Sequence, residues 1–177
     1  MQKIVGHRLH HNCMLHGVRP SPLELNELDD RIIMLDAITS TENIGSIARS
    51  AAALGVCSYL LPKDAPHPYS RRSLRVSMGH ISKLHYHIYE NIFQTIIFLQ
   101  NAGYKVFAAE VDETSIPLQN IKVPKKWVIL MGHEGKGLSK EIINLCDQSV
   151  LIEMNSDVRS LNVGVAASIL MYKFCYD

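Results

Sequence analysis

From Arg31 onward, short apolar runs alternate with longer amphipathic segments along the chain. Six runs bounded by polar or glycine positions predict β-strands: RIIMLDAI, CSYLLP, SKLHYHIY, KVFAAEV, WVILMG and SVLIEM. Four longer segments have the length and spacing of helices, namely NIGSIARSAAALG, NIFQTIIFLQNAG, LSKEIINLC and SLNVGVAASILMYKF. Gly55 and Gly103 fall where two of these helices should stop. This alternation predicts an α/β fold with a mostly parallel six-stranded sheet and helices on both faces.

The first 30 residues have a different character, because they are polar, contain two prolines and end in an acidic run. We therefore predict an N-terminal arm over residues 1–30 with no role in the core, followed by one domain over residues 31–177. A length of 177 residues, 47% of them hydrophobic, is enough for one domain with a proper core.

The apolar stretches and the cysteines of the chain indicate the cellular compartment in which the protein works. None of the stretches approaches the roughly 20 residues that a membrane span requires, and the N-terminus lacks the apolar block of a signal peptide. Cys13, Cys57, Cys146 and Cys175 lie far apart and form no CxxC pair, as expected of free thiols in a reducing compartment. We expect a cytoplasmic protein with no membrane partner.

The overall charge is almost balanced, with 18 Lys and Arg against 17 Asp and Glu, which gives little support for a nucleic-acid partner. One window between Pro62 and His87 is nevertheless basic, with four histidines beside its cations. Those cations are Lys63, Arg71, Arg72, Arg75 and Lys83. Such a window either follows RNA phosphates or is simply a solvated face.

Two polar loops follow predicted strands and are the first places to search for a ligand, because ligands of open parallel sheets bind beyond the carboxyl ends of the strands. The loop GHEGKGLS contains three glycines and one glutamate, which allows a backbone to approach a ligand closely. The loop NSDVRSLN is long and polar between an apolar strand and an apolar helix. Loops of this kind often carry function.

Several familiar motifs are absent. The glycine-rich loop is not GxGxxG, since Glu134 occupies the second glycine position, and its spacing does not match a P-loop. No G-x-S-x-G elbow is present. The histidines of the N-terminus, namely His7, His10, His11 and His16, have no cysteine or carboxylate at ligand spacing, so we expect no metal site.

Three segments in order resemble the SpoU (TrmH) branch of the SPOUT methyltransferases. They are NIGSIARSAAALG, VILMGHEGKGLS and LIEMNSDVRSLNVGVAASILMY, within residues 31–172. The resemblance implies a C-terminal trefoil knot, a homodimer and transfer of a methyl group from S-adenosylmethionine to a ribose 2′-hydroxyl in tRNA or rRNA. The run Asp157–Ser160 resembles small tRNA wobble-position methylases of the family, which slightly favours tRNA.

The resemblance also implies roles for individual residues. It places the cofactor against the knotted loops, at Ala109, Gly132, Ile152, Met154 and Leu161. The reacting groups match Arg49, Asn43, Glu134, Ser160 and Asn162, with Arg49 contributed across the dimer interface. RNA contacts are expected from Lys63, Arg71, Arg72, Arg75 and Arg159.

Simpler explanations exist for some of these residues. Asn43 and Asn162 are also typical helix N-caps, and Glu134 is well placed to stabilise the start of a following helix. Arg49 alternatively reaches solvent from a buried helix, while Ile152 and Leu161 suit ordinary core packing.

The third segment departs twice from the family pattern, with Glu153 in place of a proline and Ser156 in place of a glycine. A rival interpretation is a non-catalytic RNA-binding or assembly protein with the same fold. The joint presence of four polar residues argues against it, namely Arg49, Glu134, Ser160 and Asn162. A nucleotide-binding enzyme of ordinary doubly wound topology is disfavoured by the failed glycine fingerprints.

Overall fold

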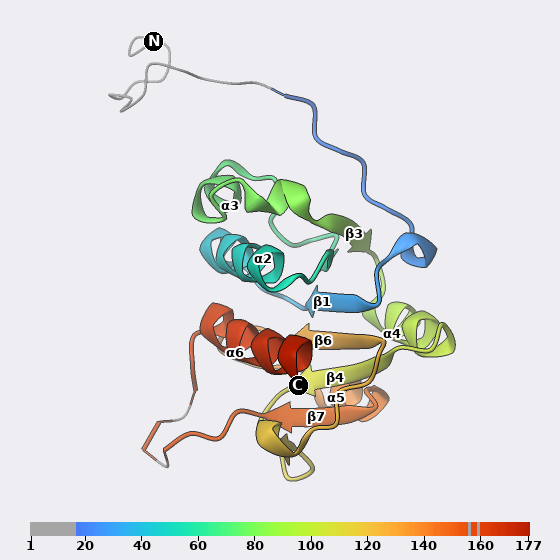
Figure 1. Cartoon of the computed structure of the whole chain (residues 1–177), viewed down its shortest axis with the longest axis vertical. Helices are drawn as coiled ribbons and strands as arrows, with labels where there is room; N and C mark the ends of the chain where they lie inside the picture. The colour runs from blue at the N-terminus through green and yellow to red at the C-terminus, as the bar shows by residue number, and fades with distance from the viewer. Residues whose placement is uncertain (1–16, 156, 159) are drawn as a thin grey trace.

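A computed structural model describes residues 17–155, 157–158 and 160–177. Its centre is a parallel sheet of seven strands in the order β3-β2-β1-β6-β4-β7-β5 (Figure 1). The strands are β1 (Arg31–Leu35), β2 (Ser58–Pro62), β3 (His85–Tyr89), β4 (Lys105–Ala109), β5 (Ile116–Pro117), β6 (Trp127–Met131) and β7 (Gln148–Leu151). The predicted α/β class and parallel sheet are confirmed.

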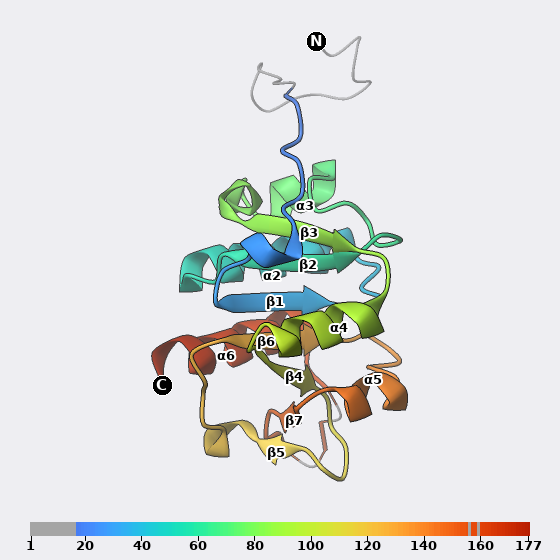
Figure 2. The ribbon, with the colours of Figure 1, turned by 90° about the vertical axis from the view of Figure 1, so that its right-hand side faces the viewer.

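The predicted count of six strands is wrong by one, because the two-residue strand β5 was missed. It pairs with β7 at one edge of the sheet (Figure 2). Two residues, one of them proline, give no alternating pattern that a sequence reading can detect.

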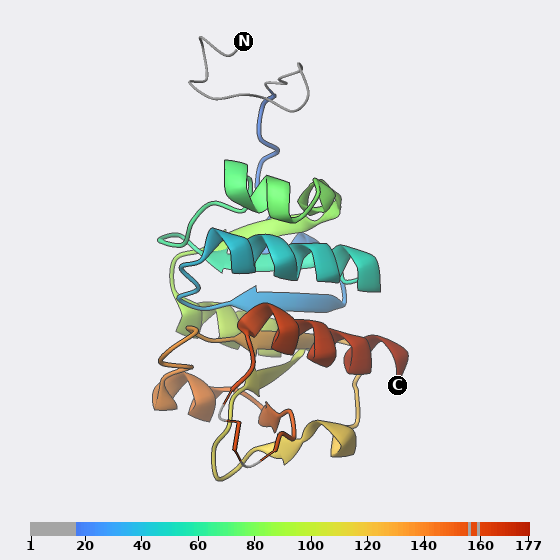
Figure 3. The same cartoon turned by 90° about the vertical axis from the view of Figure 1, so that its left-hand side faces the viewer.

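Helices cover both faces of the sheet, as the sequence predicts. On one face lie α2 (Thr41–Leu54), α3 (Arg71–Val76) and α6 (Val163–Tyr176), as Figure 3 shows. On the other lie α4 (Ile92–Asn101) and α5 (Lys140–Leu145), in front of the sheet in Figure 2. Short 3-10 turns form η1 (Leu25–Glu27), η2 (His80–Lys83) and η3 (Leu118–Asn120).

Each face of the sheet has its own apolar core. Alternate residues of β1 supply both, since Ile33 and Leu35 pack beneath α2 and α6 while Ile32 and Met34 pack beneath α4 and α5. Burial on both faces explains why the central strands read as continuous apolar runs rather than as alternating ones.

Helix α2 begins and ends at recognisable signals. The Ser40 hydroxyl accepts a hydrogen bond from the backbone N–H of Asn43 and caps the start, while Gly55 adopts the left-handed conformation (φ 77°) and ends the helix as predicted. Asn43 is therefore the third residue of the helix, and the N-cap explanation for it is wrong.

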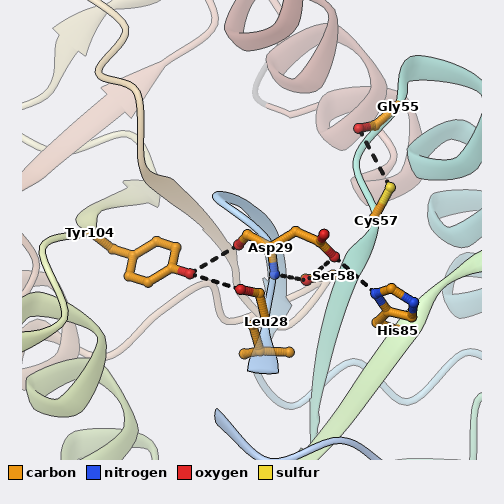
Figure 4. Close-up of polar contacts among 7 residues, drawn as sticks. All are labelled: Leu28, Asp29, Gly55, Cys57, Ser58, His85 and Tyr104. Carbon is orange, nitrogen blue, oxygen red and sulfur yellow. Dashed lines mark hydrogen bonds and ion pairs between the residues drawn. The ribbon is translucent and has the colours of Figure 1, made fainter. Parts of the chain in front are cut away.

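The segment that leads into β1 is held against the amino-terminal edge of the sheet (Figure 4). The Asp29 carboxylate accepts a hydrogen bond from the Ser58 hydroxyl (3.0 Å) and lies 3.0 Å from His85 Nδ1, while the Tyr104 hydroxyl donates to the Asp29 carbonyl (3.0 Å). Leu25 and Leu28 also pack against the α4 side of the core. The expectation that this segment makes no core contribution is therefore wrong for these two leucines.

Helix α6 returns from the β7 side to pack on α2 and β6, with the Ser168 hydroxyl 2.8 Å from that of Ser50. The C-terminal trefoil knot and the boundary at residue 30 stay predictions. Within the described residues, no helix has the length and apolar character needed to cross a membrane.

Candidate active site

A pocket of about 430 Å³ lies at the carboxyl ends of β4, β6 and β7. This is the edge at which an open parallel sheet is expected to bind ligands. Apolar side chains line it together with two loop segments, residues 132–137 after β6 and, after β7, Ile152, Met154, Ser160 and Leu161. The size falls within the range of small-molecule sites, and this mixture of surfaces suits a partly apolar ligand.

The glycines of the first loop allow it to fold back on itself. A Cβ atom at Gly132 would lie 2.6 Å from the Gly137 carbonyl carbon and 2.7 Å from the Leu138 nitrogen. Gly137 has a φ of 67°, in the left-handed region that favours glycine. Glycine is therefore needed at position 132 so that the loop can pack against itself. This packing in turn sets the shape of the pocket wall.

Three polar side chains from separate parts of the chain meet beside the pocket. Asn43 on α2 donates a hydrogen bond from Nδ2 to Glu134 Oε1 (2.9 Å) and accepts one at Oδ1 from Asn162 Nδ2 (3.1 Å). Asn162 also caps α6 by accepting from the backbone N–H groups of Gly164 and Val165. Its helix-capping role is therefore confirmed, and the same side chain joins the network.

The surroundings of Glu134 favour its ionised form. Burial raises the pKa of its carboxyl, but the hydrogen bond from Asn43, backbone hydrogen bonds and the nearby His133 together hold the pKa below its usual value. The side chain that caps α5 is that of Ser139, so Glu134 does not supply this hydrogen bond, and its role toward the helix dipole stays a prediction. Glu134 is thus an anionic acceptor at the rim of the pocket.

Arg49 lies away from this network in the same chain. Six residues separate it from Asn43, so the two side chains point about 120° apart and lie about 9 Å apart along the helix axis. Arg49 is exposed, whereas Ile44, Ile47 and Ala48 face the sheet. Across the described part of the chain, no hydrogen bond or ion pair to Arg49 is present.

Comparison with known proteins assigns the family. Residues 30–172 match the model of the SpoU rRNA Methylase family. The chain belongs to the SpoU rRNA methylase family. Its resemblance to the SpoU branch is therefore confirmed.

Individual relatives of this SpoU family chain support the same assignment. It is 30% identical to a 23S rRNA (guanosine-2′-O-)-methyltransferase from Acinetobacter baylyi, over 99% of this chain and 74% of that protein. It is also 31% identical to a putative TrmH family tRNA/rRNA methyltransferase from Staphylococcus aureus, over 80% of this chain and 57% of that protein.

Solved structures of related proteins share the fold of this SpoU family chain. An AdoMet-bound rRNA methyltransferase from Sinorhizobium meliloti superposes with a TM-score of 0.78 at 25% identity, over 88% of this chain and 60% of that one. The SpoU methyltransferase AviRb from Streptomyces viridochromogenes has a TM-score of 0.78 at 26% identity, over 88% and 63%. The chain thus spans less than two thirds of several relatives that it resembles.

The residues predicted to hold the cofactor all line the pocket of this family member. They are Ala109, Gly132, Ile152, Met154 and Leu161. Ser160, predicted among the reacting groups, lines it as well. The structure therefore gathers these six residues, which come from the end of β4 and from the loops after β6 and β7, around one space, although their roles stay predictions.

Four of the predicted RNA contacts lie outside the pocket lining, and two of these four have acidic partners. Lys63 forms an ion pair with Glu90 (2.5 Å), and Arg72 forms one with Glu42. Arg71 and Arg75 are exposed on α3, and Arg159 lies outside the described residues. Pairing lowers the net positive charge that this window offers to phosphates.

The N-terminal histidines lie outside the described residues, so the prediction that they hold no metal stays untested. In the part of the chain that is described, no three His, Cys, Asp or Glu side chains are grouped to hold an ion.

Two residues of the site were not singled out from the sequence. Glu110 follows β4 directly and lines the pocket, and its carboxylate accepts a hydrogen bond from the Leu138 N–H (2.9 Å). His133 accepts at Nδ1 from the N–H groups of Gly135 (2.8 Å) and Lys136 (3.2 Å). A charged residue at the carboxyl end of an apolar strand was the available signal for Glu110.

Proposed function

We propose that this protein transfers a methyl group from S-adenosylmethionine to a ribose 2′-hydroxyl of rRNA or tRNA. The observation that carries the proposal is the pocket at the carboxyl ends of β4, β6 and β7, with the Asn43–Glu134–Asn162 network at its rim. Family membership supports it, as do the 23S rRNA 2′-O-methyltransferase and the AdoMet-bound relative.

The pocket residues fit S-adenosylmethionine chemically. The apolar side chains of Ile152, Met154 and Leu161 suit the adenine ring and the carbon chain beside the sulfonium, while the tight backbone at Gly132 offers polar groups without a side chain in the way. The bound donor supplies a sulfonium methyl group. No metal is required for its transfer.

The proposed chemistry is an in-line displacement at the methyl carbon. The ribose oxygen forms the new O–C bond, the C–S bond breaks with its electron pair passing to sulfur, and the hydroxyl proton passes to water. Arg49 stabilises the negative charge that develops on the oxygen, because a guanidinium stays protonated and cannot act as a base. Glu134 and Asn162 orient the ribose, and alignment itself supplies much of the rate.

We further propose that the protein is a homodimer in which Arg49 serves the partner's pocket. Four apolar side chains on one face of α6 are exposed: Val165 (49%), Ile169 (38%), Tyr172 (63%) and Tyr176 (64%). Their spacing of three or four residues forms a single stripe, which a second copy would cover. Arg49 is exposed on α2, which packs beside α6.

The proposed partner is RNA, and the proposed location is the cytoplasm. Phosphate contacts are assigned to the basic window, namely Lys63, Arg71, Arg72 and Arg75, and to Arg159. A homodimer doubles these cations, which compensates for the low net charge of one chain.

The decisive experiment is calorimetric titration with S-adenosylmethionine and its demethylated product, followed by mapping of ribose methylation on rRNA and tRNA. Binding near one site per chain and a new 2′-O-methyl mark are expected. Binding of RNA without binding of either cofactor form would instead identify a non-catalytic RNA-binding member of the family.

The variant that tests the chemistry is Arg49→Ala. It should abolish methylation while it leaves the affinity for S-adenosylmethionine within about twofold, since Arg49 lies outside its own chain's pocket. Lys122→Ala, which removes an exposed cation that precedes β6 and lies outside the pocket, is the matched control and should keep its activity. Wild-type turnover in Arg49→Ala would refute the assignment.

A further inference from the structure

Glu110 connects two loops of the pocket that are distant in sequence. It directly follows β4, and its Oε2 accepts a hydrogen bond from the backbone N–H of Leu138, at the end of the loop after β6, at 2.9 Å. Its Oε1 accepts from the N–H of Val111 at 3.1 Å. The carboxylate therefore satisfies one donor of each loop.

The fit between Glu110 and the glycine-rich loop is close. A Cβ atom at Gly137 would lie 2.1 Å from Glu110 Oε2, closer than any side chain tolerates. The loop thus passes directly over the carboxylate, and only glycine leaves room for it. Gly137 also has a positive φ, so the loop turns at the point where Glu110 holds it.

The same contact determines the shape of the pocket. Gly132 packs against the Gly137 carbonyl and the Leu138 nitrogen, so the loop is closed upon the atoms that Glu110 binds. Glu110, Gly132 and Gly137 all line the pocket. If Leu138 loses its acceptor, the loop loses its only side-chain anchor from β4 among the described residues.

We infer that Glu110 is a positioning residue that holds the glycine-rich loop in the form that binds the methyl donor. This inference rests on the proposed function, because it assigns the pocket to S-adenosylmethionine. Glu110 acts through backbone hydrogen bonds, so its effect falls on donor binding and not on the reacting oxygen.

A second anchor acts within the loop. His133 Nδ1 accepts the N–H groups of Gly135 and Lys136, which fixes the turn internally. Glu110 therefore has a distinct task, since it sets where the turn as a whole lies relative to β4.

The test compares Glu110→Ala, Glu110→Gln and the matched control Glu113→Ala, which removes an exposed glutamate of the same connection. Loss of a charge-assisted hydrogen bond should weaken binding of S-adenosylmethionine about tenfold and raise its KM equally, with kcat within about twofold. Glutamine retains an oxygen for Leu138 but not a second acceptor for Val111, so Glu110→Gln should lose only part of what Glu110→Ala loses and stay within about threefold of wild type. Glu113→Ala should match wild type.

A mutant cycle with Gly137 tests the contact itself. Gly137→Ala alone should weaken donor binding through both backbone strain and collision with Glu110. In a Glu110→Ala background the collision is gone, so the further loss from Gly137→Ala should be several-fold smaller. Strictly multiplicative losses would contradict the inference.

Hydrogen exchange separates this inference from the proposed function. The Leu138 amide should exchange faster in Glu110→Ala than in Glu113→Ala, with or without the donor present. Failure of the wild-type protein to bind S-adenosylmethionine would overturn the proposed function and the part of the inference that concerns the donor, whereas exchange at Leu138 would still test the loop contact. Normal donor affinity in Glu110→Ala, equal losses in the alanine and glutamine variants, or unchanged exchange of Leu138 would overturn the inference.

Discussion

The carboxyl of Glu134 provides a test at the scale of one residue. Its pKa in the folded protein lies below the usual value of 4.5. The stabilisation from its hydrogen bonds is therefore fully present at a pH above 4.5, and it is lost as the pH falls through the lower folded pKa. We predict that wild type exceeds Glu134→Gln in unfolding free energy by less than about 1 kcal/mol near neutral pH. Urea titrations at several pH values should show this difference disappearing in acid, and Asn43→Ala should reduce it.

Gly132 gives a second prediction at this scale. In Gly132→Ala the new methyl group meets backbone atoms of Gly137 and Leu138, which cannot rotate away. The loop must shift, so binding of S-adenosylmethionine should weaken by at least about tenfold. Gly135→Ala is the matched control, because its Cβ meets only His133 at 3.6 Å. Equal affinities of the two variants, measured by calorimetry, would contradict this account of the loop.

The sequence predicted which residues belong to the site where a family motif contains them, but it did not predict which of them form hydrogen bonds with one another. The sequence singled out Asn43, Glu134 and Asn162, but their mutual hydrogen bonds join positions up to 119 residues apart and depend on how α2 and α6 pack. Glu110 was missed because a single glutamate after a strand has no periodicity. Its importance emerges only once the Leu138 N–H lies beside it.

At the scale of helices, glycines determine how closely α2 approaches its neighbours. A Cβ at Gly45 would lie 2.7 Å from the Ser73 carbonyl oxygen of α3, whereas one at Gly164 would lie 2.5 Å from the Ser46 hydroxyl. A hydroxyl can rotate but a carbonyl cannot. Gly45→Ala should therefore destabilise the protein by about 2 kcal/mol in urea unfolding, and Gly164→Ala by less. A larger destabilisation by Gly164→Ala than by Gly45→Ala would show that α2 and α3 can separate to accept the new methyl group.

The longer helices and strands were predicted from the sequence, and the shortest ones were missed. Helix α2 was recognised from its spacing and from Gly55, and the central strands from their apolar runs. The six-residue helix α3 was missed because its basic sequence has no apolar stripe, although Ser70 caps it and Ser73 is buried against α2. Its structure comes from tertiary contacts that local patterns do not contain.

At the scale of the whole molecule, each active site of the proposed homodimer combines the pocket of one chain with Arg49 of the other chain. If Arg49 serves the partner's pocket, Arg49→Ala and Glu134→Ala are each inactive as homodimers for different reasons. In a heterodimer, the pocket of the Arg49→Ala chain keeps Glu134 and receives Arg49 from the other chain. Random re-pairing makes half of the dimers mixed, each with one complete site, so a mixture should recover about a quarter of wild-type methylation.

This complementation separates a shared site from a site within one chain. The control is Ile169→Glu, which places a charge in the exposed stripe of α6 and should yield monomers by light scattering. With Ile169→Glu in both chains the mixture should stay inactive, because Arg49 then has no partner pocket to enter. If mixing the two inactive variants restores nothing while both still form dimers, Arg49 acts elsewhere, and its exposed position on α2 requires another explanation.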